Sequence, residues 1–345
     1  IPLFIFMAAL MQNSGIGEQI YKALAHWMGS LKGGLAVATV FACALIAALS
    51  GIGATGTSMM GLVALPEMYK YNYNHRLVLG SIAAGGALGP LIPPSVLMII
   101  VAGYADLSVG KLFLGGLVPG VLITFLYCLY ILIICYLRPE DGPSLPVDER
   151  LPIRKRLLLL FNIAIPIILA VAILVMIYTG ICTPTEASAI GAFGALLITV
   201  MNKQMNWRNL KNSMTISLKI NGMVMWILMG GGCYSALVTA SGTGKLVTDV
   251  ITSLSLGPTG TVFIMITLAF ILGMFIDPVA IVMICVPIFM AIAKAMGLDL
   301  LWVMLLVVVS VIIGYISPPF GVNLFYMKGV APTGTKIQEI GRAHV

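Results

Sequence analysis

Apolar runs long enough to cross a lipid bilayer recur from the first residue of the chain almost to the last. A helix needs about 20 apolar residues to span the hydrocarbon, where its backbone polar groups must be paired within the structure. Of the 345 residues, 60% are hydrophobic and 9% are charged, whereas roughly a quarter are charged in soluble domains. The sequence therefore predicts an all-α polytopic membrane protein without a soluble domain.

Two of the apolar stretches are divided in the middle. Beyond the first run, apolar segments lie at 33–49, 54–66, 77–104, 112–137, 157–179, 183–201, 217–238, 261–276, 278–293 and 300–327. Polar or glycine-rich residues halve the stretches 33–66 and 261–293, and each half is too short to cross the bilayer comfortably. We expect both stretches to be re-entrant helical hairpins that return to the side from which they entered.

Basic residues are unevenly distributed between the two faces that this topology defines. One face holds residues 12–32, 67–76, 138–156, 202–216 and 328–345. With its helix ends, it carries all but three of the 19 Lys and Arg residues, the exceptions being Lys111, Lys245 and Lys294. The positive-inside rule makes the richer face cytoplasmic. The net charge of +7 therefore indicates membrane orientation and not a nucleic-acid partner.

Two proline pairs interrupt apolar segments in the same way. "PLIPPS" (90–95) lies within the segment 77–104, and "YISPPF" (315–320) lies within the segment 300–327. Proline removes a backbone donor and breaks a helix interior, so we expect two broken helices. Ordinary kinks are the alternative, but two matched breaks with matched hairpins before them favour a repeated structure.

The rest of the chain supports a repeat. "MQNSGIG" (11–17) matches "VTASGTG" (238–244), and nearly the same length of chain separates each match from the proline pair that follows it. Residues 50–51 then fall opposite residues 277–278, and we place the hairpin tips there. Because the hairpins open to opposite faces, the repeats are inverted, as in many secondary transporters.

The matched breaks point to one shared site inside the membrane. A break exposed to lipid leaves unpaired backbone groups that cost several kcal/mol each, so it is tolerated only where it lines a protein-walled or aqueous cavity. Half-helix N-termini attract anionic groups, and unwound carbonyls can replace the water around a sodium ion. The pattern therefore predicts alternating access to an anion and a cation, and suits an open channel less well.

Few polar residues lie inside the apolar segments. Asp277 is the only carboxylate between Thr261 and Ala293, so we expect it to cap a helix N-terminus, to lie near a cation, or both. Asn323 follows the second break and is a candidate for substrate or ion contact, with a helix–helix hydrogen bond as the alternative. Glu186 completes a capping box with Thr183, which predicts a structural role at a helix start.

The first tip, "LSGIGATGTS" (49–58), combines glycines with hydroxyl groups. This composition suits ion coordination by hydroxyls and freed backbone, although small residues also serve helix packing. Its G-x-G-x-x-G spacing lacks the βαβ context of a dinucleotide-binding loop. The six cysteines form no C-x-x-C pair and the three histidines form no cluster with Cys, Asp or Glu, so we expect no metal centre and no enzymatic activity.

Four motifs follow one another along the chain: "AAGGALGPLIPPS" (83–95), "GKLFLGGLVPG" (110–120), "GICTPTEASAIGA" (180–192) and "GYISPPFGVNLFYMKGVAP" (314–332). Together they resemble the large membrane subunit of the tripartite ATP-independent periplasmic (TRAP) transporters. The resemblance implies sodium-driven uptake of small carboxylates, such as dicarboxylates or sugar acids, across the bacterial inner membrane by an elevator motion. It also implies two protein partners, a periplasmic substrate-binding protein and a small membrane subunit, either separate or fused.

The resemblance also assigns site residues. One cation site would comprise Ser50, Gly51, Thr55, Gly89 and Pro93, and the other Asp277, Gly314, Ser317 and Pro318. The substrate would lie between the hairpin tips, near Gly53, Thr57, Ser95 and Asn323. Sodium ions would be the coupling ions, and the resemblance implies no other cofactor.

These expectations divide the chain into parts. Residues 1–120 form the first inverted repeat, residues 121–216 the scaffold helices with the basic loop 138–156, and residues 217–340 the second repeat. Residues 341–345, "GRAHV", do not match the family, so we expect a fragment that lacks both natural ends. A sodium/anion symporter of similar two-hairpin architecture that needs no binding protein is the alternative, and protons could replace sodium.

Overall fold

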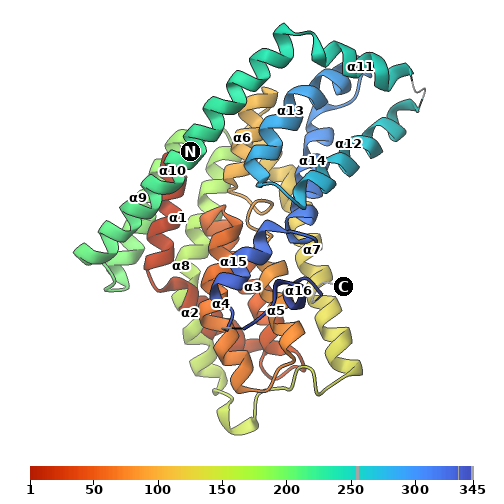
Figure 1. The fold of residues 1–345 in the computed structure, drawn as a ribbon. Helices are drawn as coiled ribbons and strands as arrows, with labels where there is room; N and C mark the ends of the chain where they lie inside the picture. The colour runs from red at the N-terminus through yellow and green to blue at the C-terminus, as the bar shows by residue number, and fades with distance from the viewer. Residues whose placement is uncertain (254–255, 333, 343–345) are drawn as a thin grey trace.

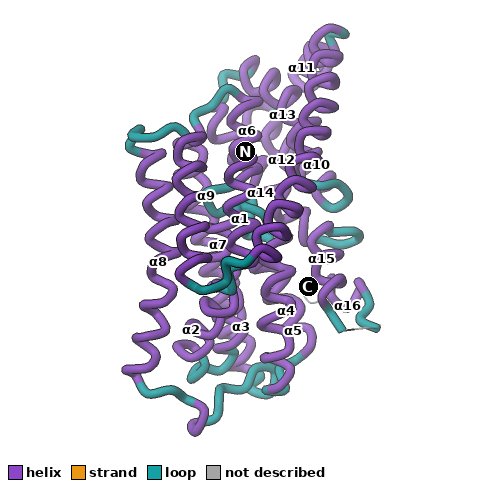
Figure 2. The backbone as a smooth tube through the Cα atoms, turned by 90° about the vertical axis from the view of Figure 1, so that its left-hand side faces the viewer, coloured by secondary structure: helices purple, strands orange, loops and turns teal. Residues whose placement is uncertain are grey.

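The computed structural model describes residues 1–253, 256–332 and 334–342, and within that part the chain is helix or loop (Figure 2). The first helices are α1 (Pro2–Asn13), α2 (Ile16–Met28), α3 (Gly34–Ser50), α4 (Gly53–Lys70), α5 (His75–Gly86), α6 (Val96–Ala105) and α7 (Val109–Leu137). After the 3-10 turn η1 (Val147–Glu149) come α8 (Ile153–Tyr178), α9 (Pro184–Met201), α10 (Trp207–Ala240), α11 (Thr243–Ser253) and α12 (Gly257–Gly273). The last are α13 (Pro278–Ala295), α14 (Leu300–Ile316), α15 (Val322–Val330) and α16 (Ile337–Arg342). The predicted all-α fold is confirmed.

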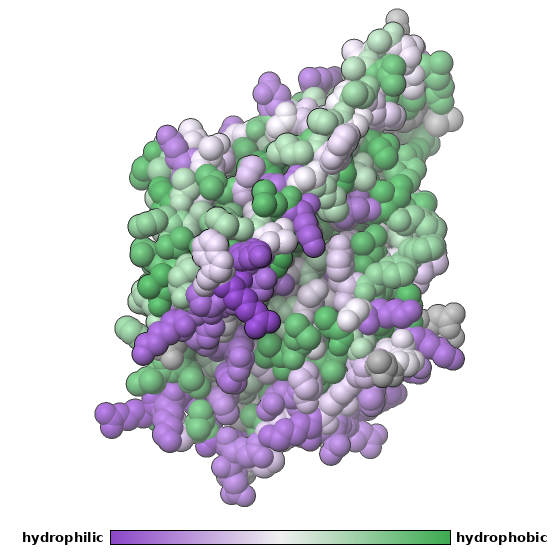
Figure 3. All heavy atoms as spheres, turned by 60° about the vertical axis from the view of Figure 1, so that its left-hand side comes forward, coloured by the Kyte–Doolittle hydropathy of each residue, from purple (hydrophilic) through white to green (hydrophobic). Residues whose placement is uncertain are grey.

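Five of the described helices are long and apolar enough to cross a membrane, namely α7, α8, α9, α10 and α13. Large apolar side chains stay exposed along α7, α8 and α10, as expected of helices that face lipid. Figure 3 shows hydrophobic residues over much of one side of the molecule, with hydrophilic residues at its lower end and in a patch at mid-height. The protein is therefore a multi-pass membrane protein.

Both predicted helical hairpins are present, but α13 is long and apolar enough to cross a membrane, contrary to the expectation that each half is too short. α3 and α4 form the first, and its tip is the two-residue turn at 51–52. α12 and α13 form the second, and residues 274–277 are its tip. In Figure 1, α3, α4 and α5 lie in the lower half of the molecule, and α12, α13 and α14 lie in the upper half.

Both predicted broken helices are also present. α5 and α6 flank an irregular segment at 87–95, and α14 and α15 flank another at 317–321, so each proline pair lies inside its break. α15 packs against α4 and α5 of the first half, whereas α6 packs against α13 of the second half (Figure 1). Each broken helix thus extends into the other half, and both breaks belong to one packed body.

α10 extends beyond the apolar segment that predicts it. Hydropathy places the span at 217–238, but the helix begins at Trp207, where the side chain of Asn206 accepts a hydrogen bond from the amide of Asn209 at 2.8 Å. The polar first turns pack on α1, and Ser213 Oγ donates to an α1 carbonyl at 3.1 Å. The predicted start was wrong because hydropathy marks where a helix is apolar and not where it begins.

α9 begins as the sequence predicts. The amide of Glu186 donates to Thr183 Oγ1 at 3.3 Å, and the amide of Thr183 donates to the Glu186 carboxylate at 2.7 Å. This reciprocal pair is a capping box. The structural role predicted for Glu186 is confirmed.

Candidate functional site

The first hairpin tip lies backbone to backbone against the first break. Gly51 ends α3 with a left-handed φ of 64°, and a Cβ on it would lie 2.3 Å from the carbonyl oxygen of Pro94. A Cβ on Gly89 would lie 2.5 Å from the amide nitrogen of Gly53. Such approaches require glycine. The predicted residues Gly51, Gly53 and Gly89 therefore all lie at the interface between the first tip and the first break. Pro93 is buried in the same break.

Two hydroxyl groups of the first tip are weakly engaged. Ser50 is 2% exposed, and its Oγ lies 3.4 Å from the carbonyl oxygen of Ile52, a long hydrogen bond. Thr55 is also buried, and its hydroxyl makes no hydrogen bond to the described residues. A void of about 10 Å³ borders both side chains, roughly the volume of a single water-sized probe. The atoms that face this void are apolar, so it does not itself present the two hydroxyl oxygens to a cation.

Thr57 and Asn323 join three helices. Thr57 Oγ1 donates to Asn323 Oδ1 at 2.8 Å, and Asn323 Nδ2 donates to the carbonyl oxygen of Ala83 at 2.6 Å. Both side chains are fully buried. α4, α15 and α5 are thereby connected across 266 residues of sequence. In this conformation Asn323 makes the helix–helix hydrogen bond that the sequence left as the alternative to a ligand contact.

Ser95 holds the first break in shape. Its Oγ donates to the carbonyl oxygen of Pro90 at 2.6 Å and accepts from the amide of Met98 at 3.3 Å. The second bond makes Ser95 the N-cap of α6. The hydroxyl of this predicted substrate residue is therefore engaged within the break.

The second half repeats the close approach between a hairpin and a broken helix. A Cβ on Gly314 would lie 2.4 Å from the carbonyl oxygen of Phe270 and 2.8 Å from Gly273 Cα. α14 can therefore approach α12 this closely only because both helices carry glycine at the contact. Gly314 is a predicted site residue, whereas Gly273 was missed, because a lone glycine in an apolar run gives no distinct signal.

The other predicted residues of the second half are more exposed than their first-half counterparts. Asp277 Oδ1 accepts from the amide of Val279 at 2.9 Å and caps α13, as predicted. Ser317 Oγ donates to the carbonyl oxygen of Ile313 at 2.7 Å, and Pro318 is exposed. The second tip therefore offers a carboxylate, where the first offers hydroxyls.

Equivalent hydrogen bonds close each hairpin on its break. The carbonyl of Gly51, the C-cap of α3, accepts from the amide of Val96 at 3.4 Å. The carbonyl of Met274, the C-cap of α12, accepts from the amide of Gly321 at 2.8 Å. Each donor lies three residues after the first proline of its pair. The structure thus repeats the backbone pairing in both halves, but it matches Gly51 to Met274 and not to Pro278, where the sequence register placed it.

Contacts between the halves join only part of the predicted set. Besides the pair of Thr57 and Asn323, a Cβ on Gly53 would lie 3.2 Å from the ring of Tyr315. The side-chain hydrogen bonds of Asp277 stay within the second half. Tyr315 was missed as a site residue, although it lies in the "YISPPF" motif, because a buried aromatic side chain carries no polar signal.

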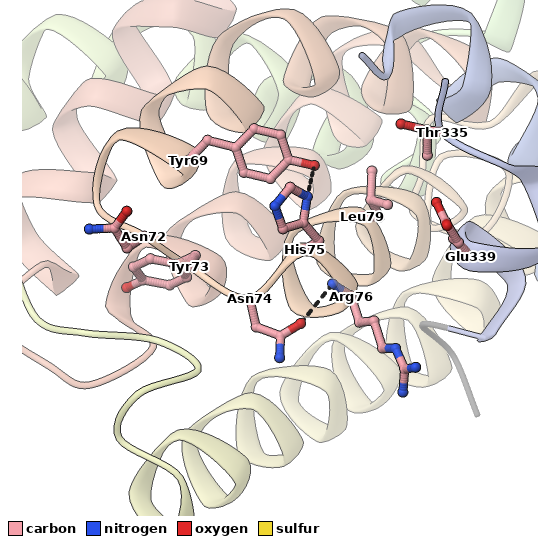
Figure 4. A pocket seen from close by; sticks show the side chains of 9 residues that line it. All are labelled: Tyr69, Asn72, Tyr73, Asn74, His75, Arg76, Leu79, Thr335 and Glu339. Atoms are coloured by element: carbon pink, nitrogen blue, oxygen red, sulfur yellow. Dashed lines mark hydrogen bonds between the residues drawn. The ribbon is translucent and has the colours of Figure 1, made fainter. Parts of the chain in front are cut away.

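A separate cavity of about 780 Å³ lies where the turn between α4 and α5 meets the C-terminal segment (Figure 4). Tyr69 Oη and His75 Nδ1 face each other at 3.1 Å, and the guanidinium of Arg76 points away from Glu339. None of the predicted site residues lines this cavity. Although this cavity is large, it is therefore not the candidate site.

Comparisons with known proteins find similarity along nearly the whole chain. The matching family model is described as "Tripartite ATP-independent periplasmic transporter, DctM component" and covers residues 1–345. The chain is 32% identical to the C4-dicarboxylate TRAP transporter large permease protein DctM of Pseudomonas aeruginosa, over 98% of this chain and 79% of that protein. It is 30% identical to the ectoine/5-hydroxyectoine TRAP transporter large permease protein UehC of Ruegeria pomeroyi, over 94% and 75%.

A solved structure supports the fold. The crystal structure of the Alcanivorax borkumensis YdaH transporter matches with a TM-score of 0.67 and 15% identity, over 99% of this chain and 80% of that chain. The named relatives are permease subunits, so the protein is a transporter subunit and not an enzyme. The chain belongs to the DctM component family of tripartite ATP-independent periplasmic transporters, whose named members are large permease subunits.

Proposed function

We propose that this subunit imports small organic anions, chiefly carboxylates, across the bacterial inner membrane, and that a sodium gradient drives the uptake. The names of two relatives support the substrate class, because they specify C4-dicarboxylates and, for a 28% identical protein of Escherichia coli, 2,3-diketo-L-gulonate. Delivery by a periplasmic binding protein follows from the family. The bias of basic residues toward one face identifies that face as cytoplasmic.

The observation that carries the proposal is the closure of each hairpin tip on a broken helix by matched backbone contacts. Such breaks place freed carbonyls beside the tip, and carbonyls of this kind bind sodium in transporters. At the first tip, the hydroxyls of Ser50 and Thr55 would supply side-chain oxygens, together with backbone oxygens of Gly51, Gly89 and Pro93. At the second tip, Asp277 would supply a carboxylate beside the backbone of Gly314, Ser317 and Pro318.

The substrate would lie between the tips. Thr57 and Asn323 are the polar side chains nearest the join between the two halves. Asn323 still has a second amide hydrogen and a second lone pair on its oxygen. Because Asn323 and Ser95 are fully buried here, a carboxylate would reach the free amide hydrogen of Asn323, beside Gly53 and Ser95, only in a conformation in which the two halves open.

An elevator motion is the mechanism that suits this body. α15 packs on α4, and α6 packs on α13, which supports a transport body made of the hairpins and broken helices that would move against α7, α8 and α9. Coupling requires ion and substrate to strengthen each other's binding, typically by about 1–3 kcal/mol. A small membrane subunit, separate or fused, would extend the scaffold. A 28% identical relative named isethionate TRAP transporter permease protein DctMQ, of which this chain covers 53%, supports the fused form.

The test is uptake of a labelled dicarboxylate into proteoliposomes that contain the protein with its small membrane subunit. Four conditions combine the presence or absence of an inward sodium gradient with the presence or absence of the cognate binding protein. We expect uptake only when both are present. Ser50→Ala and Asp277→Asn should lower uptake and raise the sodium concentration at half-maximal rate, and Ser30→Ala, an exposed serine outside the site, should change neither.

Two outcomes would redirect the proposal. Uptake with sodium alone favours the binding-protein-independent symporter of similar architecture. Uptake that depends on a proton gradient and not on sodium would show that sodium is not the coupling ion. Asp277 would then be the first residue to test as the proton carrier.

A further inference from the structure

Three aromatic side chains meet at the second hairpin tip. Phe275 belongs to the tip, Phe320 to the second break and Phe325 to α15. The ring centroids of Phe275 and Phe320 are 5.9 Å apart at an interplanar angle of 48°, and those of Phe320 and Phe325 are 5.9 Å apart at 23°. Both spacings lie within the range of attractive ring pairs. The three residues therefore form an aromatic cluster that joins the tip to the break and to the helix after it.

The aromatic cluster lies beside the hydrogen bond that closes this tip. The amide of Gly321, the residue after Phe320, donates to the carbonyl of Met274, the residue before Phe275, at 2.8 Å. The ring pair of Phe275 and Phe320 therefore links the same two segments that the backbone hydrogen bond links. If the tip moves away from the break, the rings separate and the hydrogen bond breaks together.

The first tip closes on its break without aromatic side chains. The equivalent positions, counted from the two closing hydrogen bonds, hold Ile52, Ser95 and Ile100. The first break is buried throughout residues 87–95, and its glycine backbone meets the backbone of the tip. In the second break, by contrast, residues 318–320 are exposed. Buried backbone packing therefore closes the first tip, whereas exposed side chains help to close the second.

The rings of the aromatic cluster are about half exposed. The exposed fraction is 50% for Phe275, 51% for Phe320 and 44% for Phe325. Segments with few buried contacts open at the lowest free energy, and moving parts of proteins are drawn from them. The second tip is therefore the one that can open more readily, and the aromatic cluster opposes its opening.

Asp277 belongs to the same tip and follows Phe275 by two residues. Its Oδ1 accepts a hydrogen bond from the amide of Val279 at 2.9 Å, so the carboxylate moves with the start of α13. The negative charge of Asp277 also acts on the hydroxyls of Tyr315 and Tyr326, which belong to the helices on either side of the break. In the closed tip, the carboxylate therefore lies near the break.

We propose that Phe275, Phe320 and Phe325 are positioning residues, whose packed rings hold the second hairpin tip on its break and thereby keep Asp277 beside that break. The second tip, and not the first, is the one that opens. The effect of the aromatic cluster on sodium rests on the proposed function, which places a cation at Asp277. The opening of the tip does not depend on which ion is coupled.

The first experiment measures hydrogen–deuterium exchange by mass spectrometry, on the protein with its small membrane subunit in lipid nanodiscs. Because the amide of Gly321 donates across the closed tip, its exchange reports opening. In Phe320→Ala, peptides that contain residues 274–280 or Gly321 should exchange about tenfold faster, since two ring pairs are lost. Peptides that contain the first tip should exchange at the parent rate.

Three further variants locate the effect. Phe275→Leu removes one ring pair but keeps an apolar side chain, so it should accelerate exchange at the second tip by a smaller factor than Phe320→Ala. Phe320→Tyr keeps a ring that can stack, and should restore exchange close to that of the parent. Phe263→Ala removes an exposed phenylalanine of α12 that has no ring contact among the described residues, and should leave exchange at the tip unchanged.

The second experiment is sodium-dependent uptake in proteoliposomes, which separates positioning from a general loss of folded protein. Phe320→Ala should raise the sodium concentration at half-maximal rate several-fold, while the rate at saturating sodium stays near that of the parent. A loss of folded protein would instead lower the maximal rate and leave the half-maximal concentration unchanged. Phe320→Tyr should restore the parent value.

Two exchange results would overturn the inference, whichever ion is coupled. One is exchange at the second tip that neither Phe320→Ala nor Phe275→Leu accelerates. The other is equal acceleration at both tips, which would show general destabilisation. Faster exchange at the second tip with an unchanged sodium dependence would support the opening of the tip and contradict the proposed cation site at Asp277, so the two failures are distinguishable.

Discussion

Replacing Gly51 by alanine tests whether the first hairpin tip closes on the first break. At φ of 64° an alanine costs about 1–2 kcal/mol, because its Cβ crowds the following carbonyl. The same Cβ would lie 2.3 Å from the carbonyl oxygen of Pro94, and relief of such overpacking typically costs a further ~1–3 kcal/mol. Gly51→Ala should therefore destabilise the protein by about 2–5 kcal/mol.

The assay is the midpoint of thermal unfolding in detergent at one fixed scan rate. With an unfolding entropy of about 2.1 cal/mol/K per residue over 345 residues, the loss corresponds to a fall of about 3–7 °C. Gly103→Ala is the matched control, because Gly103 lies in α6 and a Cβ there meets nothing within 4 Å. Alanine favours a helix by about 0.5–1 kcal/mol over glycine, so this midpoint should rise slightly.

The sign of the change in the unfolding midpoint of each variant decides between the two outcomes. A fall for Gly51→Ala with no fall for Gly103→Ala supports the closed tip. A Gly51→Ala midpoint within 1 °C or so of the parent would mean that the tip has room for a Cβ, and the backbone contact with Pro94 described above would be wrong.

Three further predictions concern other parts of the chain. Thr57→Val leaves the buried Asn323 amide without one partner and should cost about 1–3 kcal/mol, and a double-mutant cycle with Asn323→Ala should show strong coupling; additive effects would rule out the bond. Thr183→Ala removes the capping box and should cost about 0.5–2 kcal/mol, whereas Thr179→Ala, at an exposed hydroxyl, should cost little; equal losses would contradict the capping role. The pKa of His26 is lowered in the folded protein, mainly by burial, so the unfolded chain binds this proton more tightly and stability falls as the pH drops below about 6.5. His26→Gln should reduce that fall between pH 7 and 5.5 in an unfolding series, and an unchanged pH profile would show that His26 does not contribute.

Local chemistry made much of this fold predictable. Proline pairs cannot continue a helix, so the breaks at 87–95 and 317–321 follow from sequence. Asp277 before Pro278 is a helix start, and the structure has α13 begin there. Polar or glycine-rich residues in the middle of apolar stretches indicated the hairpins. In each case a residue type with a strong backbone preference decides the local structure.

The contacts between the halves were beyond sequence reasoning. Nothing in the residue order says that Thr57 meets Asn323, because the bond depends on α15 lying against α4. Tyr315 is on α14, and its contact with Gly53 of α4 likewise joins residues far apart in the sequence.

The two halves differ in their side chains but share backbone hydrogen bonds, because backbone groups close each hairpin on its break. Gly51 and Met274 occupy equivalent places, and each offers only its carbonyl to the break. Gly51 must be glycine, since its φ is positive, whereas Met274 has a φ of −69° and tolerates a side chain. Met274→Ala should therefore leave the midpoint of unfolding nearly unchanged while Gly51→Ala lowers it. Two halves can thus diverge in residue type, hydroxyls at one tip and a carboxylate at the other, without losing the hydrogen bonds that close them.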